Sequence, residues 1–216
     1  MKIAIGIHGT ENVTTQVYFN HIGAISSWAK SFDLTLIGIA KMKVAAARNS
    51  IVRRAFEQGC THWLSLDTDH CVRDDLLPLL VENASAAMVS GLVCKRGFPF
   101  DIVAFKIPSV LDTPLPIVLE PDTGVHVVDG CAMGCTLINL EKLRELPKPY
   151  FYDTPAKRSD LNLCYAFREK DESVLVDTRA WVGHETLPQV IWPKNLDKLR
   201  ALYIAASDEI GKEEAS

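Results

Sequence analysis

Two aspartates with one residue between them, Asp67 and Asp69, follow the apolar run 62–66. That run is bounded by glycine before it and by polar residues after it, which is typical of a buried strand. Because alternate strand residues share a face, both carboxylates should emerge together where the strand ends. Such a pair repels itself unless a cation lies between its members, and oxygen ligands suit Mg²⁺ and Mn²⁺. The pair predicts a metal and phosphate site, although an Asp after a strand can also be only a turn residue.

The first half of the chain alternates strand-like and helix-like segments that would position this pair. Apolar patterning predicts strands over 2–7, 34–40, 62–67 and 87–93, with helices over 17–31, 44–58 and from about residue 74. This alternation predicts an α/β fold, a doubly wound and mostly parallel sheet with helices on both faces. Ligands of such sheets bind beyond the carboxyl ends of the strands, where Asp67 and Asp69 are expected.

The second half has a different pattern. Residues 95–126 contain five prolines and lack helical periodicity, which favours a docked loop with short strands. An extended run over 125–139, helices over 140–146 and 159–170, strands over 173–177 and 181–183, and a surface helix over 195–212 should follow. We expect one domain, with a nucleotide-binding half (1–94), a smaller acceptor and donor-sugar half (95–194), and a C-terminal helix with an acidic tail (195–216).

Composition and charge exclude several classes of protein. The net charge is −4, so no global basic field attracts nucleic acid. No apolar stretch reaches the roughly 18 residues that span a bilayer, and the first residues lead into a strand rather than a signal peptide. The six cysteines lack paired spacing and should be reduced and buried. These features favour a cytoplasmic protein without a membrane span.

Five short motifs occur in an order that resembles the GT-A fold glycosyltransferases, especially the family 2 type of bacteria and phages. The motifs are Ala47-Arg48-Asn49, the run 64–69, the glycine-containing run 128–138, Ser159-Asp160 and Val182-Gly183-His184. Together they extend over most of residues 3–185. The resemblance implies a metal-dependent, inverting transfer of a sugar from a nucleotide-diphosphate donor to an acceptor hydroxyl.

By this resemblance, Asp69 and His184 would ligate Mn²⁺ or Mg²⁺, and Asp67 would contact the ribose or the water shell of the metal. A divalent ion stabilises the negative charge that grows on a departing diphosphate. Mn²⁺ accepts imidazole alongside oxygen ligands, which fits a histidine in the set. A histidine after a strand can also be a simple surface or core residue.

The resemblance implies that Asp160 is the general base that removes the proton from the acceptor hydroxyl. An acid in the first turn of a helix is also favoured by the helix dipole alone, with Ser159 as the cap. The family usually has Glu before this Asp, whereas this chain has Ser159, which leaves the acceptor contacts open.

Contacts to the nucleotide are expected from four further residues. Arg48 and Asn49 would contact the base or the diphosphate, with a solvated helix face as the alternative. His8 and Gly9 follow the first strand, where such folds cradle the nucleobase, and the glycine permits close approach of the backbone. The donor is expected to be a uridine diphosphate sugar, although the acidic residue that often reads uracil is not evident in the run 36–40.

The glycine-containing run would lie under the donor sugar. Asp129, Met133 and Gly134 are therefore expected at the sugar or the acceptor, with a simple bulge as the alternative for the glycine. The acceptor class stays open among glycans, proteins, lipid-linked sugars and modified nucleic acids. The basic pairs Lys95-Arg96 and Lys157-Arg158 could favour an anionic acceptor.

Other functions fit parts of the same pattern. A sugar nucleotidyltransferase would carry a basic, glycine-rich loop after the first strand, where this chain has one glycine and no Lys or Arg over 8–12. An aspartate-nucleophile phosphatase would have a hydroxyl residue two places after the second Asp, where Cys71 stands. A module that binds nucleotide or carbohydrate without catalysis is a further alternative. His70 and Cys71 could suggest zinc, but structural zinc sites usually use regularly spaced ligand pairs.

Overall fold

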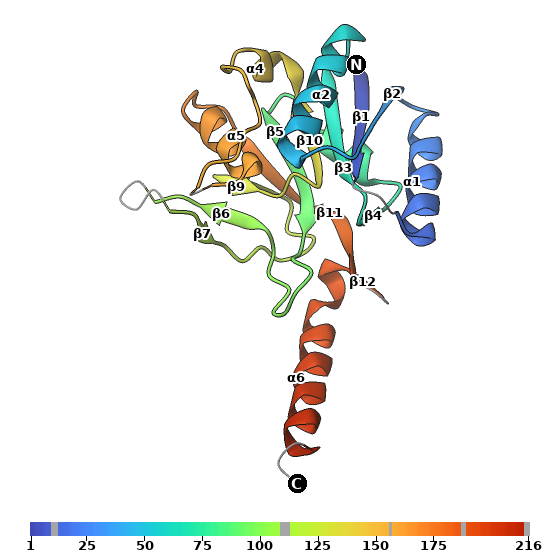
Figure 1. Ribbon diagram of the computed structural model, residues 1–216, viewed down its shortest axis with the longest axis vertical. Coiled ribbons are helices and arrows are strands. Elements are labelled where there is room, and N and C mark those ends of the chain that lie inside the picture. Colours follow the sequence, from blue (N-terminus) through green and yellow to red (C-terminus); the bar gives the residue numbers. More distant parts are fainter. Residues whose placement is uncertain (10–12, 109–112, 156, 187–188, 214–216) are drawn as a thin grey trace.

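The computed structural model describes residues 1–9, 13–108, 113–155, 157–186 and 189–213. The main path of the central sheet runs through β12 (Gln189–Ile191), β11 (Val174–Thr186), β5 (Met88–Val93), β10 (Cys135–Asn139), β3 (His62–Asp67), β1 (Lys2–Gly9) and β2 (Asp33–Ala40), in that order (Figure 1). β1 pairs in parallel with β2 and β3, and β5 pairs in parallel with β11. The sheet is therefore mostly parallel, as predicted.

The order of the strands differs from a simple alternation in one respect. β10 returns from the second half of the chain and pairs antiparallel with both β3 and β5, which it separates. All six residues of β5 and four of the six of β3 are buried, so both faces and the middle of the sheet are covered. The inserted strand brings Gly134, just before β10, to the carboxyl end of β3.

Helices cover both faces of the sheet, as expected for a doubly wound fold (Figure 1). α1 (Thr15–Trp28) and α3 (Leu76–Val81) pack through Trp28 and Leu77 against the face that carries Ile5. The other face is covered by α2 (Val44–Glu57), α4 (Leu140–Arg144) and α5 (Ser159–Arg168). Alternation along β3 explains the two layers. Leu64 packs in the core on the face that carries Ile5, and Trp63 packs in the core beneath α2, α4 and α5.

Short strands build the expected smaller elaboration. β7 (Leu115–Pro116), β6 (Ala104–Lys106) and β9 (Gly130–Cys131) form a three-stranded sheet. β4 (His70–Val72) and β8 (Val125–Val128) pair antiparallel with β11. β11 is one strand with an irregularity between Asp177 and Trp181, where two separate strands were predicted.

The C-terminal helix leaves the body of the molecule. A short 3₁₀ helix, η1 (Pro193–Asn195), leads into α6 (Leu196–Glu213), which projects away from the sheet (Figure 1). The end of the predicted acidic tail, residues 214–216, lies outside the described residues. All six cysteines are buried and free, and no helix in the described part of the chain is long and apolar enough to cross a membrane.

Candidate active site

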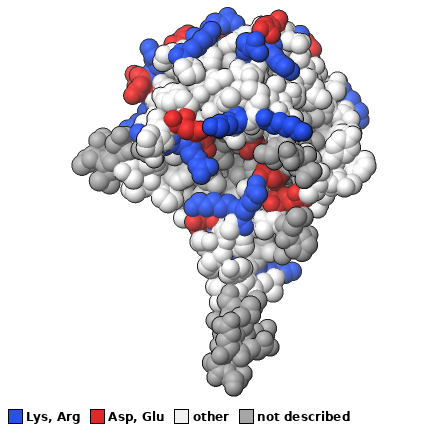
Figure 2. Space-filling view, viewed as in Figure 1, with Lys and Arg blue, Asp and Glu red and all other residues white. Residues whose placement is uncertain are grey.

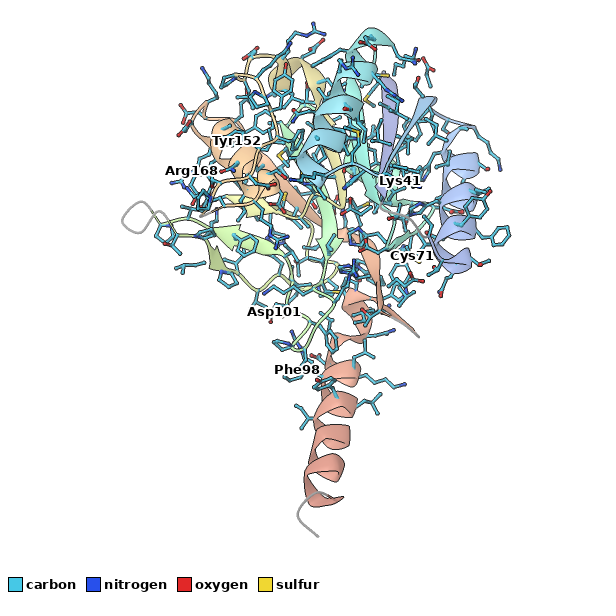
Figure 3. All side chains as sticks on the ribbon, in the orientation of Figure 1. Lys41, Cys71, Phe98, Asp101, Tyr152 and Arg168 are labelled. Atoms are coloured by element: carbon cyan, nitrogen blue, oxygen red, sulfur yellow. The ribbon has the colours of Figure 1, made fainter. Side chains whose placement is uncertain are left out.

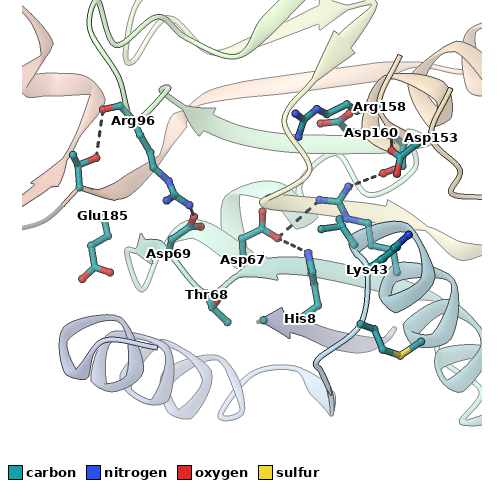
Figure 4. A pocket seen from close by; sticks show the side chains of 16 residues that line it. His8, Lys43, Asp67, Thr68, Asp69, Arg96, Asp153, Arg158, Asp160 and Glu185 are labelled. Carbon is teal, nitrogen blue, oxygen red and sulfur yellow. Dashed lines mark hydrogen bonds and ion pairs between the residues drawn. The ribbon is translucent and has the colours of Figure 1, made fainter. Parts of the chain in front are cut away.

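A cavity of about 1010 Å³ opens at the carboxyl ends of β1 and β3. The space-filling view shows basic side chains around this hollow and acidic side chains within it (Figure 2). Its lining comes from both halves of the chain and is seen from close by in Figure 4. The lining residues are His8, Gly9, Met42, Lys43, Val44, Arg48, Asp67, Thr68, Asp69, Arg96, Asp153, Arg158, Ser159, Asp160, Glu185 and Thr186.

Asp69, which lines one end of the cavity, forms a cluster with two imidazoles that are not part of the lining. Asp69 lies in the turn between β3 and β4, His70 begins β4, and His184 lies on β11. His70 and His184 face each other in the antiparallel pairing, with ring centroids 4.5 Å apart. One possible ligand atom from each of the three residues lies within 4.8 Å of the other two. Such a mixed set suits Mn²⁺ or another first-row metal better than Mg²⁺.

His70 is held in the form that a metal requires. Its Nδ1 lies 3.0 Å from the carbonyl oxygen of Gly134, which can only accept, so Nδ1 carries the proton. Nε2 is left with a lone pair, is buried, and has no hydrogen-bond partner among the described residues. Burial lowers the pKa of His70 to about 4, which keeps the imidazole neutral. An oriented, neutral and unpartnered nitrogen is what a metal ligand offers.

His184 has the same arrangement on the opposite side. Its Nδ1 donates to the carbonyl oxygen of Cys94 over 2.7 Å, so Nε2 is the acceptor. That nitrogen lies 3.5 Å from Oδ2 of Asp69 and accepts a hydrogen bond from Nε of Arg96 over 2.9 Å. Burial lowers the pKa of His184. The two residues expected as metal ligands thus lie together, and His70 joins them.

Oδ1 of Asp67 faces a second group of side chains. This oxygen lies 3.5 Å from Nε2 of His8 and 4.0 Å from Nη2 of Arg48 (Figure 4). Nη1 of Arg48 in turn donates to Oγ of Ser159 over 3.4 Å, on the far wall of the cavity. Burial is the main reason that the pKa of His8 is lowered. Asp67 therefore faces His8 and Arg48 through Oδ1, whereas Asp69 belongs to the metal-ligand cluster, although both emerge from one strand end.

Gly134 contacts both Asp67 and the metal-ligand cluster. Its carbonyl oxygen accepts from the backbone N–H of Asp67 over 2.9 Å and from His70. A Cβ on this residue would lie 2.0 Å from Cε1 of His70 and 2.8 Å from Oδ2 of Asp67. Only glycine leaves the room that these two side chains occupy. Gly9 is similarly close to Thr68, whose Cγ2 would lie 2.9 Å from an added Cβ.

The opposite end of the cavity is formed by the start of α5. Asp160 lies in the first turn of this helix, and its Oδ1 accepts from the N–H of Leu161 over 2.9 Å. The backbone N–H of Ser159 donates to Oδ1 of Asp153 over 2.9 Å, so Asp153 caps the helix. The loop before α5 also brings Arg158 to the cavity. A carboxylate thus faces the hollow from the wall opposite the metal-ligand cluster (Figure 4).

Five residues expected at the site do not line the cavity. His184 and Gly134 contact lining residues, as described above, whereas the side chains of the other three are used elsewhere. The amide of Asn49 donates to the carbonyl oxygens of Ala45 and Phe151 and so ties α2 to the chain before α5. Met133 is 1 % exposed and belongs to the core. Asp129 accepts from the backbone N–H of Ile107 over 2.8 Å. The positions of these three residues are structural, because each side chain is used to pack or tie segments together.

Several residues in or beside the cavity were not expected to act together at one site. His70 was considered only as part of a zinc pair, since its antiparallel pairing with His184 depends on residues more than a hundred positions apart. The pairs Lys95-Arg96 and Lys157-Arg158 did signal a basic region, and one member of each, Arg96 and Arg158, lines the cavity. Lys43, Asp153 and Glu185 also line it and gave no recognisable pattern in the sequence.

Comparison with solved structures identifies the fold but not the reaction. No family model matches the chain, and a search of curated proteins found no match either. The crystal structure of A197 from STIV superposes with a TM-score of 0.65 at 16 % identity, covering 90 % of this chain and 91 % of that one. The crystal structure of GalNAc-T7 with UDP, GalNAc and Mn²⁺ gives a TM-score of 0.55 at 13 % identity, covering 85 % and 43 %. The chain therefore has a single-domain GT-A-like fold, similar to that of a known glycosyltransferase.

Proposed function

We propose that this protein is a metal-dependent, inverting glycosyltransferase that moves a sugar from a nucleotide-diphosphate donor to an acceptor hydroxyl. The observation that carries the proposal is one cavity with two chemically different ends. Asp69 lines one end and is clustered with His70 and His184, and the carboxylate of Asp160 lines the other. A transfer of this kind needs a cation for the leaving group and a base for the attacking group.

Asp69, His70 and His184 would hold the metal, for which two imidazoles favour Mn²⁺ over Mg²⁺. When bound, a divalent ion supplies Lewis-acid stabilisation for the negative charge of the departing diphosphate. The fit rests on the buried Nε2 of His70, which has no hydrogen-bond partner among the described residues and faces the other two groups. GalNAc-T7, which shares the fold, was solved with UDP and Mn²⁺, and by analogy we propose a uridine nucleotide for the donor.

The basic residues of the cavity would bind the donor. Arg48 lies between Asp67 and Ser159, with Lys43 on the same helix start, and both can pair with phosphate oxygens. His8 and Gly9, at the end of β1, would approach the nucleoside, and Asp67 would accept from a ribose hydroxyl. These contacts hold the donor with its diphosphate at the cluster and its sugar toward the α5 wall.

Asp160 would act as the general base. Its carboxylate takes the proton of the acceptor hydroxyl while that oxygen forms a bond to the anomeric carbon. The bond between the anomeric carbon and the diphosphate oxygen breaks in the same step, and the nucleoside diphosphate leaves with the electron pair. Attack from the face opposite the leaving group inverts the configuration of the sugar. A base and a metal site on opposite walls fit this direction of attack.

The proposal is tested by incubating the protein with a panel of nucleotide sugars and simple glycan acceptors, with Mn²⁺ or with a chelator. We expect nucleoside diphosphate to be released from a uridine donor only with metal, and NMR of the product to show inverted configuration. Asp69→Asn should abolish the release, whereas Asp171→Asn, an exposed change outside the cavity, should leave it intact. Release that is equal with and without metal would contradict the proposed mechanism.

A further inference from the structure

One arginine occupies the metal-ligand cluster in a way that the proposed reaction does not explain. Nη2 of Arg96 donates to Oδ2 of Asp69, and its Nε donates to Nε2 of His184 over 2.9 Å. A single guanidinium thus engages two of the three groups that could hold a metal. Arg96 lies in the loop after β5, on the side of the cavity formed by the second half of the chain.

The lone pair of His184 makes the two cations mutually exclusive. Nδ1 of His184 is committed as a donor to Cys94, so Nε2 has one lone pair to offer. That lone pair either accepts the N–H of Arg96 or coordinates a metal ion, and it cannot do both. Oδ2 of Asp69 also accepts from this guanidinium but keeps a second lone pair, so the exclusion arises at His184. A metal that uses these ligands must displace Arg96.

The side chain of Arg96 can move while its loop stays in place. Arg200 of α6 donates to the carbonyl oxygen of Pro99 over 2.6 Å, and the ring of Phe98 stacks on Tyr203 with centroids 4.8 Å apart. Figure 3 shows Phe98 and Asp101 where this loop meets the protruding helix. The side chain of Arg96 is 59 % exposed, so its guanidinium is not confined by packing.

We propose that Arg96 is a built-in cation that competes with the divalent metal for Asp69 and His184 and moves to the diphosphate of the donor when the metal binds. This inference rests on the proposed function. It explains why a basic side chain from an exposed loop is aimed at a cluster of acceptors. The displaced guanidinium stays at the cavity, where Lys43, Arg48 and Arg158 already gather positive charge. A guanidinium donates two parallel hydrogen bonds to phosphate, and a diphosphate has the acceptor oxygens for them.

The first test measures Mn²⁺ binding to the full chain without nucleotide, by electron paramagnetic resonance of the free ion. The Arg96→Gln variant should bind Mn²⁺ roughly tenfold more tightly than the wild type, because it lacks the charged hydrogen bond that competes with the metal. The matched control is Lys95→Gln, which removes one positive charge from the neighbouring exposed residue, whose amine faces Asp101 at 3.3 Å. That variant should stay within about twofold of the wild type. Arg96→Lys should fall between, because a point charge cannot span both acceptors.

The second test measures the affinity for inorganic pyrophosphate by calorimetry with Mn²⁺ at saturation. Here Arg96→Gln should bind roughly tenfold more weakly than wild type, so the same change has opposite signs for metal and for diphosphate. Equal Mn²⁺ affinities for Arg96→Gln and Lys95→Gln, in a wild type that binds Mn²⁺, would overturn the competition and leave the proposed function standing. Unchanged pyrophosphate affinity would overturn the move to the diphosphate. If neither the wild type nor Arg96→Gln binds Mn²⁺, both proposals fail.

Discussion

The two ends of the cavity are built from different kinds of structure. The metal-ligand end is built on strands. The register of β4 against β11 places His70 opposite His184, and the carbonyl oxygen of Gly134, just before β10, accepts from His70. The Asp160 end is a loop and one helix turn, held by Asp153 at the cap and by Asn49 from α2. His70 is 3 % exposed, whereas Asp160 is half-buried at the surface of the cavity.

This difference separates two requirements of the proposed reaction. A metal site needs ligand atoms that are fixed to within a fraction of an ångström, and paired strands give that precision. An acceptor site must fit the shape of a particular acceptor, and loops vary more freely in length and sequence than the strands they connect. We expect the strand-built end to be rigid and intolerant of change, and the α5 end to determine which hydroxyl is used.

Asp160→Asn should separate the two ends of the cavity most clearly, because it should lose turnover and keep metal binding. The amide cannot take up the proton, so turnover should fall by a factor of about 100 or more. The affinity for Mn²⁺, measured by electron paramagnetic resonance, should change less than twofold, because the carboxylate lies on the wall away from the cluster. Asp69→Asn should instead lose both turnover and metal. Parallel losses in the two variants would mean that the ends of the cavity do not act separately.

Gly134→Ala should show the rigidity of the strand-built end. An added Cβ would lie 2.0 Å from Cε1 of the buried His70 and 2.8 Å from Oδ2 of Asp67. We expect a loss of about 3 kcal/mol in the free energy of unfolding in urea, together with weaker Mn²⁺ binding. Gly38→Ala is the control, since an added Cβ there meets nothing within 4 Å. Similar stability for the two variants would show that the cluster adapts easily.

The elements of the first half follow closely from the sequence, because each has a clear period of its own. Apolar spacing placed α2 and β3 to within one residue of their observed ends. The pairing of β10 between β3 and β5 could not be read in this way, since no local pattern specifies a partner about seventy residues away. For the same reason the sequence predicted two separate strands where β11 runs continuously through a bulge.

The candidate site shows the same division between local and distant information. Asp67 and Asp69 were expected together from strand alternation, and His184 was expected beside Asp69 only through the family resemblance. His70 was missed as a partner because its role depends on β4 and β11 lying side by side. Met133 was placed at the donor sugar although it faces the core, because the irregular chain between β9 and β10 does not alternate as a strand does.

Acid should weaken the strand-built end through His70. Burial lowers the pKa of the folded imidazole to about 4, below the usual value near 6.5, so the unfolded chain binds the proton more tightly. Stability should therefore fall as the pH falls through about 6.5 toward 4, by about 2 kcal/mol between pH 7 and pH 5 for this residue. Urea unfolding with a chelator present should show a loss smaller by that amount in His70→Asn. Equal losses in both proteins would contradict a neutral, buried His70.

Asn49→Ala should have the smallest effect and should act on the α5 end alone. The change removes two donated hydrogen bonds, 2.9 Å to Ala45 and 2.7 Å to Phe151, and leaves the Phe151 carbonyl without this donor. We expect a loss of about 1 kcal/mol in urea unfolding, with Mn²⁺ affinity unchanged. The exposed Asn195 offers a control, for which Asn195→Ala should stay within about 0.5 kcal/mol of the wild type. A lower affinity for pyrophosphate in Asn49→Ala, without a loss of stability, would instead restore this side chain to direct contact with the donor.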